Sequence, residues 1–271
     1  MTGERRTAGA AIDDARAQGR SALVVYLPVG YPDVETSIDA ARTAVEAGAD
    51  IIELGLPYSD PGMDGPVVAA AAQQALDGGV RISDVLRAVA EVASTGAATL
   101  VMTYYNPVLR YGVQRFANDL AAAGGAGLIT PDLIPDEAGE WVAAADAHGL
   151  DKVFLVAPSS TPERLEMTVG AARGFVYAAS TMGVTGVRAT VGSGAEVLVA
   201  RTRAAGAERV CVGIGVSNGE QASEIAAFAD GVIVGSAAVR ALGSAPGAEG
   251  IDALRSLVID LRRGVESGVS A

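Results

Sequence analysis

A single carboxylate stands inside an otherwise apolar segment, where it could act as a general acid or base. Glu53 lies in Asp50–Leu56 (DIIELGL), a run typical of a strand buried on both faces. Side chains alternate along a strand, so Glu53 faces away from Ile52 and Leu54. Burial among apolar groups raises the pKa of a carboxyl group into the range useful for proton transfer. The alternative is a structural glutamate bound by hydroxyl groups.

The loop that follows this strand carries two further carboxylates, Asp60 and Asp64, within Pro57–Pro66 (PYSDPGMDGP). A carboxylate here could act together with Glu53. The alternative is a solvated or capping residue, because Asp64 precedes Gly65-Pro66 at the expected start of a helix.

Three glycine-bearing segments suggest a phosphate site. They are Ser180–Gly186, Val212–Ser217 and Val234–Ser236, and each follows an apolar run. Glycines let backbone amides approach phosphate oxygens, and the Ser236 hydroxyl can donate a hydrogen bond. Arg188 is the only nearby cation, and a solvated surface position is its alternative.

Three tyrosines are candidates for a flat apolar slot. Tyr26, Tyr104 and Tyr177 each fall on the face that their strand is expected to turn inward. Their hydroxyls would lie at the rim of such a slot. Packing in an apolar core is the alternative for each of them.

Scarce residue types exclude several mechanisms. The chain has one histidine, His148, one lysine, Lys152, and one cysteine, Cys211. It therefore cannot build a multi-histidine or thiolate metal site by itself. A Schiff base would need Lys152, yet Lys152 opens a strand and His148 ends the helix before it. We expect no metal here, and a solvated charge at Lys152.

The elements that must position these residues alternate along the chain. Eight short apolar runs are expected as strands: Ala22–Val29, Asp50–Leu56, Thr99–Tyr105, Gly127–Leu133, Lys152–Ala157, Gly174–Ala179, Arg209–Val216 and Gly231–Gly235. Between them, helical spacing marks Val34–Ala47, Val113–Ala123, Asp136–His148, Glu163–Ala171, Ser193–Ala205 and Gly219–Phe228.

Capping residues mark the ends of these helices. Asp33, Ser83, Asp136, Thr161 and Asn218 are expected as N-caps, and Gly48, Gly149 and Gly206 as helix stops.

This alternation predicts an α/β fold, a single (β/α)8 TIM barrel spanning residues 1–271. An amphipathic segment from Glu4 to Gln18 is expected as an extra N-terminal helix over the barrel floor. A doubly wound open sheet is the alternative, although it usually has fewer strands. In barrel enzymes the site lies at the carboxyl ends of the strands, which favours Glu53 and disfavours Lys152.

Composition limits the partners and the compartment. A formal net charge of −12 disfavours nucleic acid binding, which needs a basic surface. No apolar run approaches the roughly 18 residues of a membrane span. One cysteine and no signal pattern make a cytoplasmic location the expectation.

The motifs together resemble the tryptophan synthase alpha chain family. The loop Pro57–Pro66 after Ile51–Leu56 closely resembles the family signature. Further matches, in family order, are Met102–Pro107, Pro131–Leu133, Gly183–Gly186, Gly213–Ser217 and Gly235-Ser236. The resemblance extends from about Ile12 to Leu261. Small departures are Gly62-Met63 before Asp64, and Ile134 where a proline is common.

The resemblance implies retro-aldol cleavage of indole-3-glycerol phosphate to indole and glyceraldehyde 3-phosphate, a lyase reaction of tryptophan biosynthesis. It implies Glu53 as the acid–base, and Asp64 as the acceptor of a hydrogen bond from the indole N–H. It also implies a substrate pocket and a phosphate site. The substrate residues are Tyr26, Tyr104, Tyr177 and Ile214, and the phosphate residues are Gly186, Gly215, Gly235 and Ser236.

The resemblance further implies a partner, the tryptophan synthase beta chain, in an α2β2 heterotetramer. Pyridoxal phosphate would belong to that partner, and this chain would need no cofactor. The loops Tyr58–Gly65 and Thr181–Gly194 would close over the substrate.

Two alternatives remain open. Another phosphate-binding barrel, such as an indole-glycerol-phosphate synthase or a phosphoribosyl isomerase relative, would need a strand-end lysine or a different set of carboxylates. A barrel that only activates its partner would not need Glu53 and Asp64.

Overall fold

Eight parallel strands close into a barrel, with β8 pairing back to β1. The computed structural model describes residues 5–179 and 193–268. The strands are β1 (Ala22–Pro28), β2 (Ile51–Gly55), β3 (Ala98–Met102), β4 (Gly127–Thr130), β5 (Asp151–Val156), β6 (Val176–Ala179), β7 (Val210–Gly213) and β8 (Gly231–Val234). Each coincides with one of the eight predicted runs, so the predicted (β/α)8 TIM barrel is confirmed.

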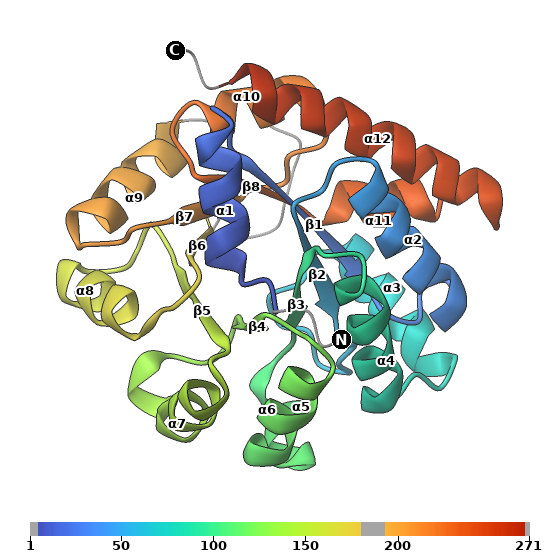
Figure 1. The fold of residues 1–271 in the computed structure, drawn as a ribbon, viewed down its shortest axis with the longest axis horizontal. Helices are drawn as coiled ribbons and strands as arrows, with labels where there is room; N and C mark the ends of the chain where they lie inside the picture. Colours follow the sequence, from blue (N-terminus) through green and yellow to red (C-terminus); the bar gives the residue numbers. More distant parts are fainter. Residues whose placement is uncertain (1–4, 180–192, 269–271) are drawn as a thin grey trace.

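Helices surround the strands in an outer ring, except α1, which lies across one end of the barrel (Figure 1). They are α1 (Ala8–Ala17), α2 (Val34–Glu46), α3 (Pro66–Asp77), α4 (Ile82–Ala93), α5 (Tyr105–Tyr111), α6 (Val113–Ala122), α7 (Gly139–His148), α8 (Pro162–Ala171), α9 (Ser193–Ala204), α10 (Gly219–Ala226), α11 (Ser236–Leu242) and α12 (Ala248–Ser267). All six predicted helices are present. The run expected as a strand through Tyr105 ends at Met102, because α5 begins at Tyr105.

Alternation along the strands produces two apolar layers. The inner layer contains Val24, Ile51, Leu100 and Phe175. The outer layer contains Leu23, Val25, Ile52 and Leu54 and packs against the helices. Since Glu53 shares the parity of Ile51, it points into the barrel as predicted.

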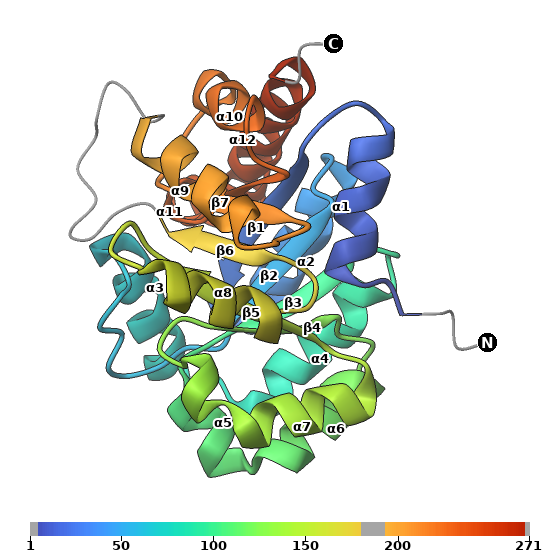
Figure 2. The same cartoon turned by 90° about the vertical axis from the view of Figure 1, so that its left-hand side faces the viewer.

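The extra N-terminal helix closes the floor of the barrel. On α1, Ala8, Ala11, Ile12 and Ala15 are fully buried and belong to the inner cluster. Asp151, at the start of β5, accepts a hydrogen bond from the Ala8 amide at 2.7 Å. Figure 2 shows α1 at the end of the barrel opposite to the one toward which the β6 arrow points.

Two of the predicted N-caps are wrong. Asp33, Thr161 and Asn218 cap α2, α8 and α10 with their side chains, as predicted. Helix α4 instead begins after Arg81, because the Asp84 carboxylate accepts from the Arg81 amide at 2.9 Å, and Ser83 therefore lies inside the helix. Asp136 lies in a short 3-10 helix, Pro135–Glu137, and α7 starts only at Gly139.

The expectation of a solvated charge at Lys152 is also wrong. Lys152 is 8% exposed, and its ammonium lies 2.7 Å from Asp146. Its position near the start of β5 is as predicted, at the end of the barrel far from the expected site. No helix within residues 5–179 and 193–268 is long and apolar enough to span a membrane.

Candidate active site

Glu53 is the most unusual polar residue of the barrel interior. It sits at the middle of β2, in register with Tyr26 on β1 and Leu100 on β3. Its side chain is fully buried, and neither carboxyl oxygen has a hydrogen-bond partner in the part of the chain that the structure describes. Burial raises the pKa of Glu53 to about 8. The alternative of a glutamate held by hydroxyl groups therefore finds no support among these residues.

Asp64 lies near the end of the loop between β2 and α3. Burial raises the pKa of its carboxyl group to about 6, and a hydrogen bond with Tyr104 opposes that rise. The predicted capping alternative is wrong, because Gly65 is the N-cap of α3 and Pro66 is its first residue. The two carboxyl groups thus differ in their proton affinity, and Glu53 is the stronger base.

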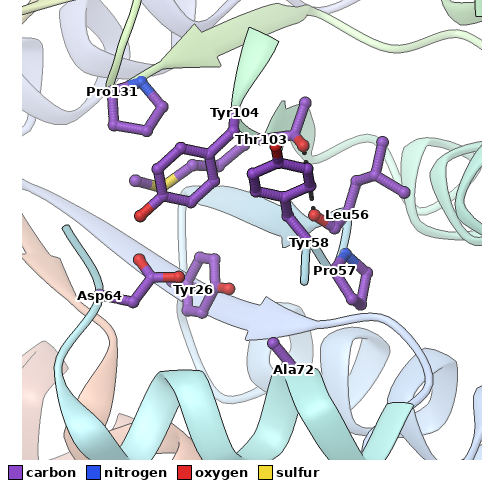
Figure 3. Close-up of a pocket in the computed structure, with 10 residues that line it drawn as sticks. Tyr26, Leu56, Pro57, Tyr58, Asp64, Ala72, Thr103, Tyr104 and Pro131 are labelled. Atoms are coloured by element: carbon purple, nitrogen blue, oxygen red, sulfur yellow. Dashed lines mark hydrogen bonds between the residues drawn. The ribbon is translucent and has the colours of Figure 1, made fainter. Parts of the chain in front are cut away.

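A cavity lies at the carboxyl ends of the first strands (Figure 3). Its lining comes from β1, from the ends of β2 and β3 with the loops after them, from α3 and from the loop after β4: Tyr26, Leu56, Pro57, Tyr58, Asp64, Ala72, Met102, Thr103, Tyr104 and Pro131. Three of the predicted site residues, Tyr26, Asp64 and Tyr104, therefore share one cavity. Glu53 is not in the lining, because it lies deeper on β2.

Two buried tyrosines interact electrostatically with Glu53, Tyr26 from the adjacent β1 and Tyr177 from β6 across the barrel, and glycines make room for both. A Cβ atom at Gly55 would overlap the Tyr26 hydroxyl, and one at Gly213 would overlap the Tyr177 hydroxyl. Burial, reinforced by the nearby Glu53 carboxylate, raises the pKa of Tyr26 and of Tyr177 well above its usual value. Both phenols are therefore neutral and able to donate hydrogen bonds at any physiological pH.

Tyr104 connects the cavity to the loop that carries Asp64. Its hydroxyl accepts a hydrogen bond from the Met63 amide at 2.8 Å. Its ring lies 5.3 Å from that of Tyr58, at an angle of 32°. Figure 3 shows both rings opposite Asp64 and Tyr26 across the cavity.

The predicted phosphate residues lie at the ends of β7 and β8. Gly235 is the N-cap of α11, and Ser236 is the first residue of that helix. A Cβ atom at Gly235 would lie 3.5 Å from the Tyr26 ring, so this end of β8 adjoins the cavity. Gly215 follows β7 with a positive φ of 83°. Gly186 and Arg188 lie outside the described residues.

Ile214, like Glu53 and Tyr177, is a predicted site residue that does not belong to the cavity lining. It is half-buried and packs against the outer apolar layer. Within residues 5–179 and 193–268, no three His, Cys, Asp or Glu side chains gather as metal ligands would.

Several lining residues were not identified as site residues from the sequence. Tyr58, Thr103 and Pro131 lie in the cavity wall, and Asn106 contacts Tyr58. The sequence did contain an indication of their role, because each of them falls in or beside a motif at the carboxyl end of a strand. What the sequence did not reveal is which of these loops contact one another.

Comparisons with known proteins agree with this architecture. A family model described as tryptophan synthase alpha chain matches residues 12–262. The tryptophan synthase alpha chain of Mycobacterium marinum is 60% identical over 268 residues, which is 98% of each chain. That of Mycobacterium tuberculosis (strain H37Ra) is 59% identical over 263 residues, 97% of this chain and 96% of the relative.

Solved structures give the same result. A structure of Mycobacterium tuberculosis tryptophan synthase superposes with a TM-score of 0.90 and 58% identity, covering 97% of this chain and 99% of that one. A chain of the tryptophan synthase α2β2 complex from Pyrococcus furiosus superposes with a TM-score of 0.83 and 34% identity, covering 89% and 98%. The chain therefore belongs to the tryptophan synthase alpha chain family.

Proposed function

We propose that this protein cleaves indole-3-glycerol phosphate to indole and glyceraldehyde 3-phosphate, the lyase step that gives tryptophan biosynthesis its indole. One observation carries the assignment of the chemistry. A fully buried glutamate, whose carboxyl oxygens have no hydrogen-bond partner within residues 5–179 and 193–268, lies beside a cavity that holds a second carboxylate and three tyrosines.

In the proposed reaction, Glu53 moves one proton. With a pKa of about 8, its carboxyl group is protonated near neutral pH and can donate to C3 of the indole ring. The ring becomes a cationic indolenine. The Glu53 carboxylate then takes the proton of the adjacent glycerol hydroxyl as the C–C bond breaks. The electron pair of the broken C–C bond returns to the ring, the carbon that carried the hydroxyl becomes the aldehyde carbon, and Glu53 is protonated again.

Asp64 has a different task in this scheme. A pKa of about 6 leaves its carboxyl group ionised near neutral pH, when Glu53 still holds its proton. As a carboxylate, it accepts a hydrogen bond from the indole N–H and stabilises the positive charge of the indolenine. Two carboxyl groups with separated pKa values are a recurrent basis for such a division of roles.

The remaining site residues bind the two ends of the substrate. In this proposal Tyr26, Tyr104 and Ile214 contact the indole ring, and Tyr177 positions the glycerol hydroxyl beside Glu53. Gly215, Gly235 and Ser236, together with Gly186, hold the phosphate group through backbone amides and one hydroxyl. The proximity of Gly235 to Tyr26 supports a phosphate site next to the slot.

We propose a tryptophan synthase beta chain as the partner, in an α2β2 complex. Three large apolar side chains are exposed after successive strands at the site end of the barrel: Met63 at 59%, Leu109 at 50% and Ile134 at 40%. The strands that precede them, β2, β3 and β4, are adjacent in the barrel, which makes these side chains candidates for one interface. The Pyrococcus furiosus relative is described as an α2β2 complex.

The chain itself is proposed to need no cofactor, with pyridoxal phosphate held by the beta chain. We also propose that its 271 residues form one domain and act in the cytoplasm, where the free, buried Cys211 stays reduced.

The experiment that tests this function measures indole release from indole-3-glycerol phosphate, with and without a cognate beta chain. Wild type and Glu53→Gln are compared. We expect slow release by wild type, acceleration by the beta chain, and loss of release in the variant. No release by wild type even with its partner would refute the assignment and leave a purely activating barrel or another phosphorylated substrate.

A further inference from the structure

The loop that carries Asp64, residues 57–65, is hydrogen-bonded near both of its ends to residues at the start of α5. Near its start, Tyr58 accepts a hydrogen bond from the Asn106 side-chain amide at 3.2 Å. Near its end, the Met63 amide donates to the Tyr104 hydroxyl at 2.8 Å. Among the described residues, no other element outside residues 57–65 forms a hydrogen bond with the loop side chains or amides from Tyr58 to Asp64.

The first turn of α5 is itself held from the next loop along the barrel. Asp132, which follows β4, accepts the Tyr105 amide with both carboxylate oxygens, at 2.9 and 3.2 Å. Tyr105 is the first residue of α5, and Tyr104 is its N-cap, whose side chain makes no capping bond. A free amide at a helix start is stabilised by a carboxylate, so Asp132 supplies the cap that the helix lacks.

We propose that Asp132 is a positioning residue for the cleavage reaction: it fixes the first turn of α5, which holds the Asp64 loop through Tyr104 and Asn106. The inference rests on the proposed function and adds a residue that touches neither the substrate nor Asp64. Asp132 is exposed and lies outside the cavity lining.

The physical reason is that Asp64 must meet the indole N–H at hydrogen-bond distance. The contacts inside the loop are short-range, such as the Gly62 amide to the Asp60 carbonyl at 2.9 Å. These contacts shape the loop but do not place it over the cavity. Placement depends on the α5 contacts, and a displacement of about 1 Å can reduce turnover by about a hundredfold.

The test compares three variants with a matched control. Asp132→Ala removes the cap, Asp132→Asn keeps one acceptor oxygen, and Tyr104→Phe keeps the ring but loses the hydroxyl. Asp136→Ala is the control, because Asp136 is an exposed carboxylate in the same loop that pairs with Arg164 on α8. The full chain is assayed alone, so that impaired partner binding cannot cause an effect.

Two measurements are made on each protein. The first is kcat and KM for indole release as a function of pH. We expect Asp132→Ala to lower kcat about tenfold with KM within about twofold, and Asp132→Asn to restore part of the loss. The Tyr104 hydrogen bond lowers the pKa of Asp64, so Tyr104→Phe and Asp132→Ala should both move the acidic limb of the pH profile upward. A purely structural role would not shift that limb.

The second measurement is amide hydrogen exchange of the segment 57–65. Faster exchange there in Asp132→Ala and Tyr104→Phe, with wild-type exchange in Asp136→Ala, supports the proposal. If Asp132→Ala matches Asp136→Ala in exchange and in kinetics, the proposal is wrong. If wild type releases no indole, the proposed function fails while exchange still decides whether Asp132 holds the loop. Should Asp132→Ala not fold, Asp132→Asn and Tyr104→Phe carry the same comparison.

Discussion

Replacing Glu53 by glutamine should remove activity and, near neutral pH, make the protein more stable. In the folded state, burial raises the pKa of Glu53 from its ordinary 4.5 to about 8. Between these values the unfolded chain has released the proton that the folded chain keeps. Stability from this group is therefore fully present below pH 4.5 and falls as the pH rises toward 8.

The magnitude follows from that interval. Each pH unit corresponds to about 1.4 kcal/mol, so the interval from 4.5 to about 8 amounts to about 5 kcal/mol at pH 8 and about 3 kcal/mol at pH 7. Glutamine is neutral at every pH and nearly isosteric with the protonated acid. The Glu53→Gln protein should thus unfold like wild type at pH 4.5 and be several kcal/mol more stable at pH 8.

The assay is urea unfolding followed by circular dichroism at both pH values, with indole release measured on the same samples. Glu140→Gln, an exposed site, is the control for removal of one carboxylate. We expect a higher urea midpoint for Glu53→Gln at pH 8 only, together with lost turnover. An equal or lower midpoint at pH 8 would refute the argument that an unpartnered, desolvated carboxyl group is maintained at a cost to stability.

Four further outcomes are expected. The kcat/KM profile of wild type should be bell-shaped, rising through the Asp64 pKa of about 6 and falling through the Glu53 pKa of about 8; a profile flat from pH 5 to 9 would contradict it. Asp64→Asn should lower kcat about a hundredfold, measured by indole release, whereas near-normal kinetics would remove its proposed role. Ser236→Ala should raise KM more than it lowers kcat, and the reverse pattern would argue against a phosphate contact. Gly55→Ala should displace the Tyr26 side chain and weaken the binding of indole-containing inhibitors, measured by calorimetry. Unchanged affinity would show that the Tyr26 ring can make room for the added methyl group without disturbing the pocket.

Part of the site was predictable because it depends only on local geometry. Glu53 points inward because alternation along a strand is a property of the extended backbone, and the neighbouring apolar residues fix which face is outside. The carboxyl ends of the strands gather Tyr26, Asp64 and Tyr104 because a closed parallel barrel leaves its loops at one end.

Other predictions failed where a competing side-chain contact decided the outcome. Ser83 resembles an N-cap, but the Asp84 carboxylate accepts a hydrogen bond from the Arg81 amide, and α4 begins two residues earlier. Lys152 was expected in solvent, but its ammonium group forms an ion pair with Asp146 from the preceding helix. The sequence contains both partners in each case without indicating which pairing the packed fold selects.

The sequence by itself therefore determined the eight β/α units, the inward carboxylate and the family, since each is encoded in short-range pattern and motif. Only the tertiary structure decided that Glu53 has no hydrogen-bond partner among the described residues, that the Tyr104 hydroxyl accepts from the Met63 amide, and that Asp132 caps α5. The physical reason is that these contacts join loops from different β/α units. Their distances are set by how the strands close into a barrel, which no local segment specifies.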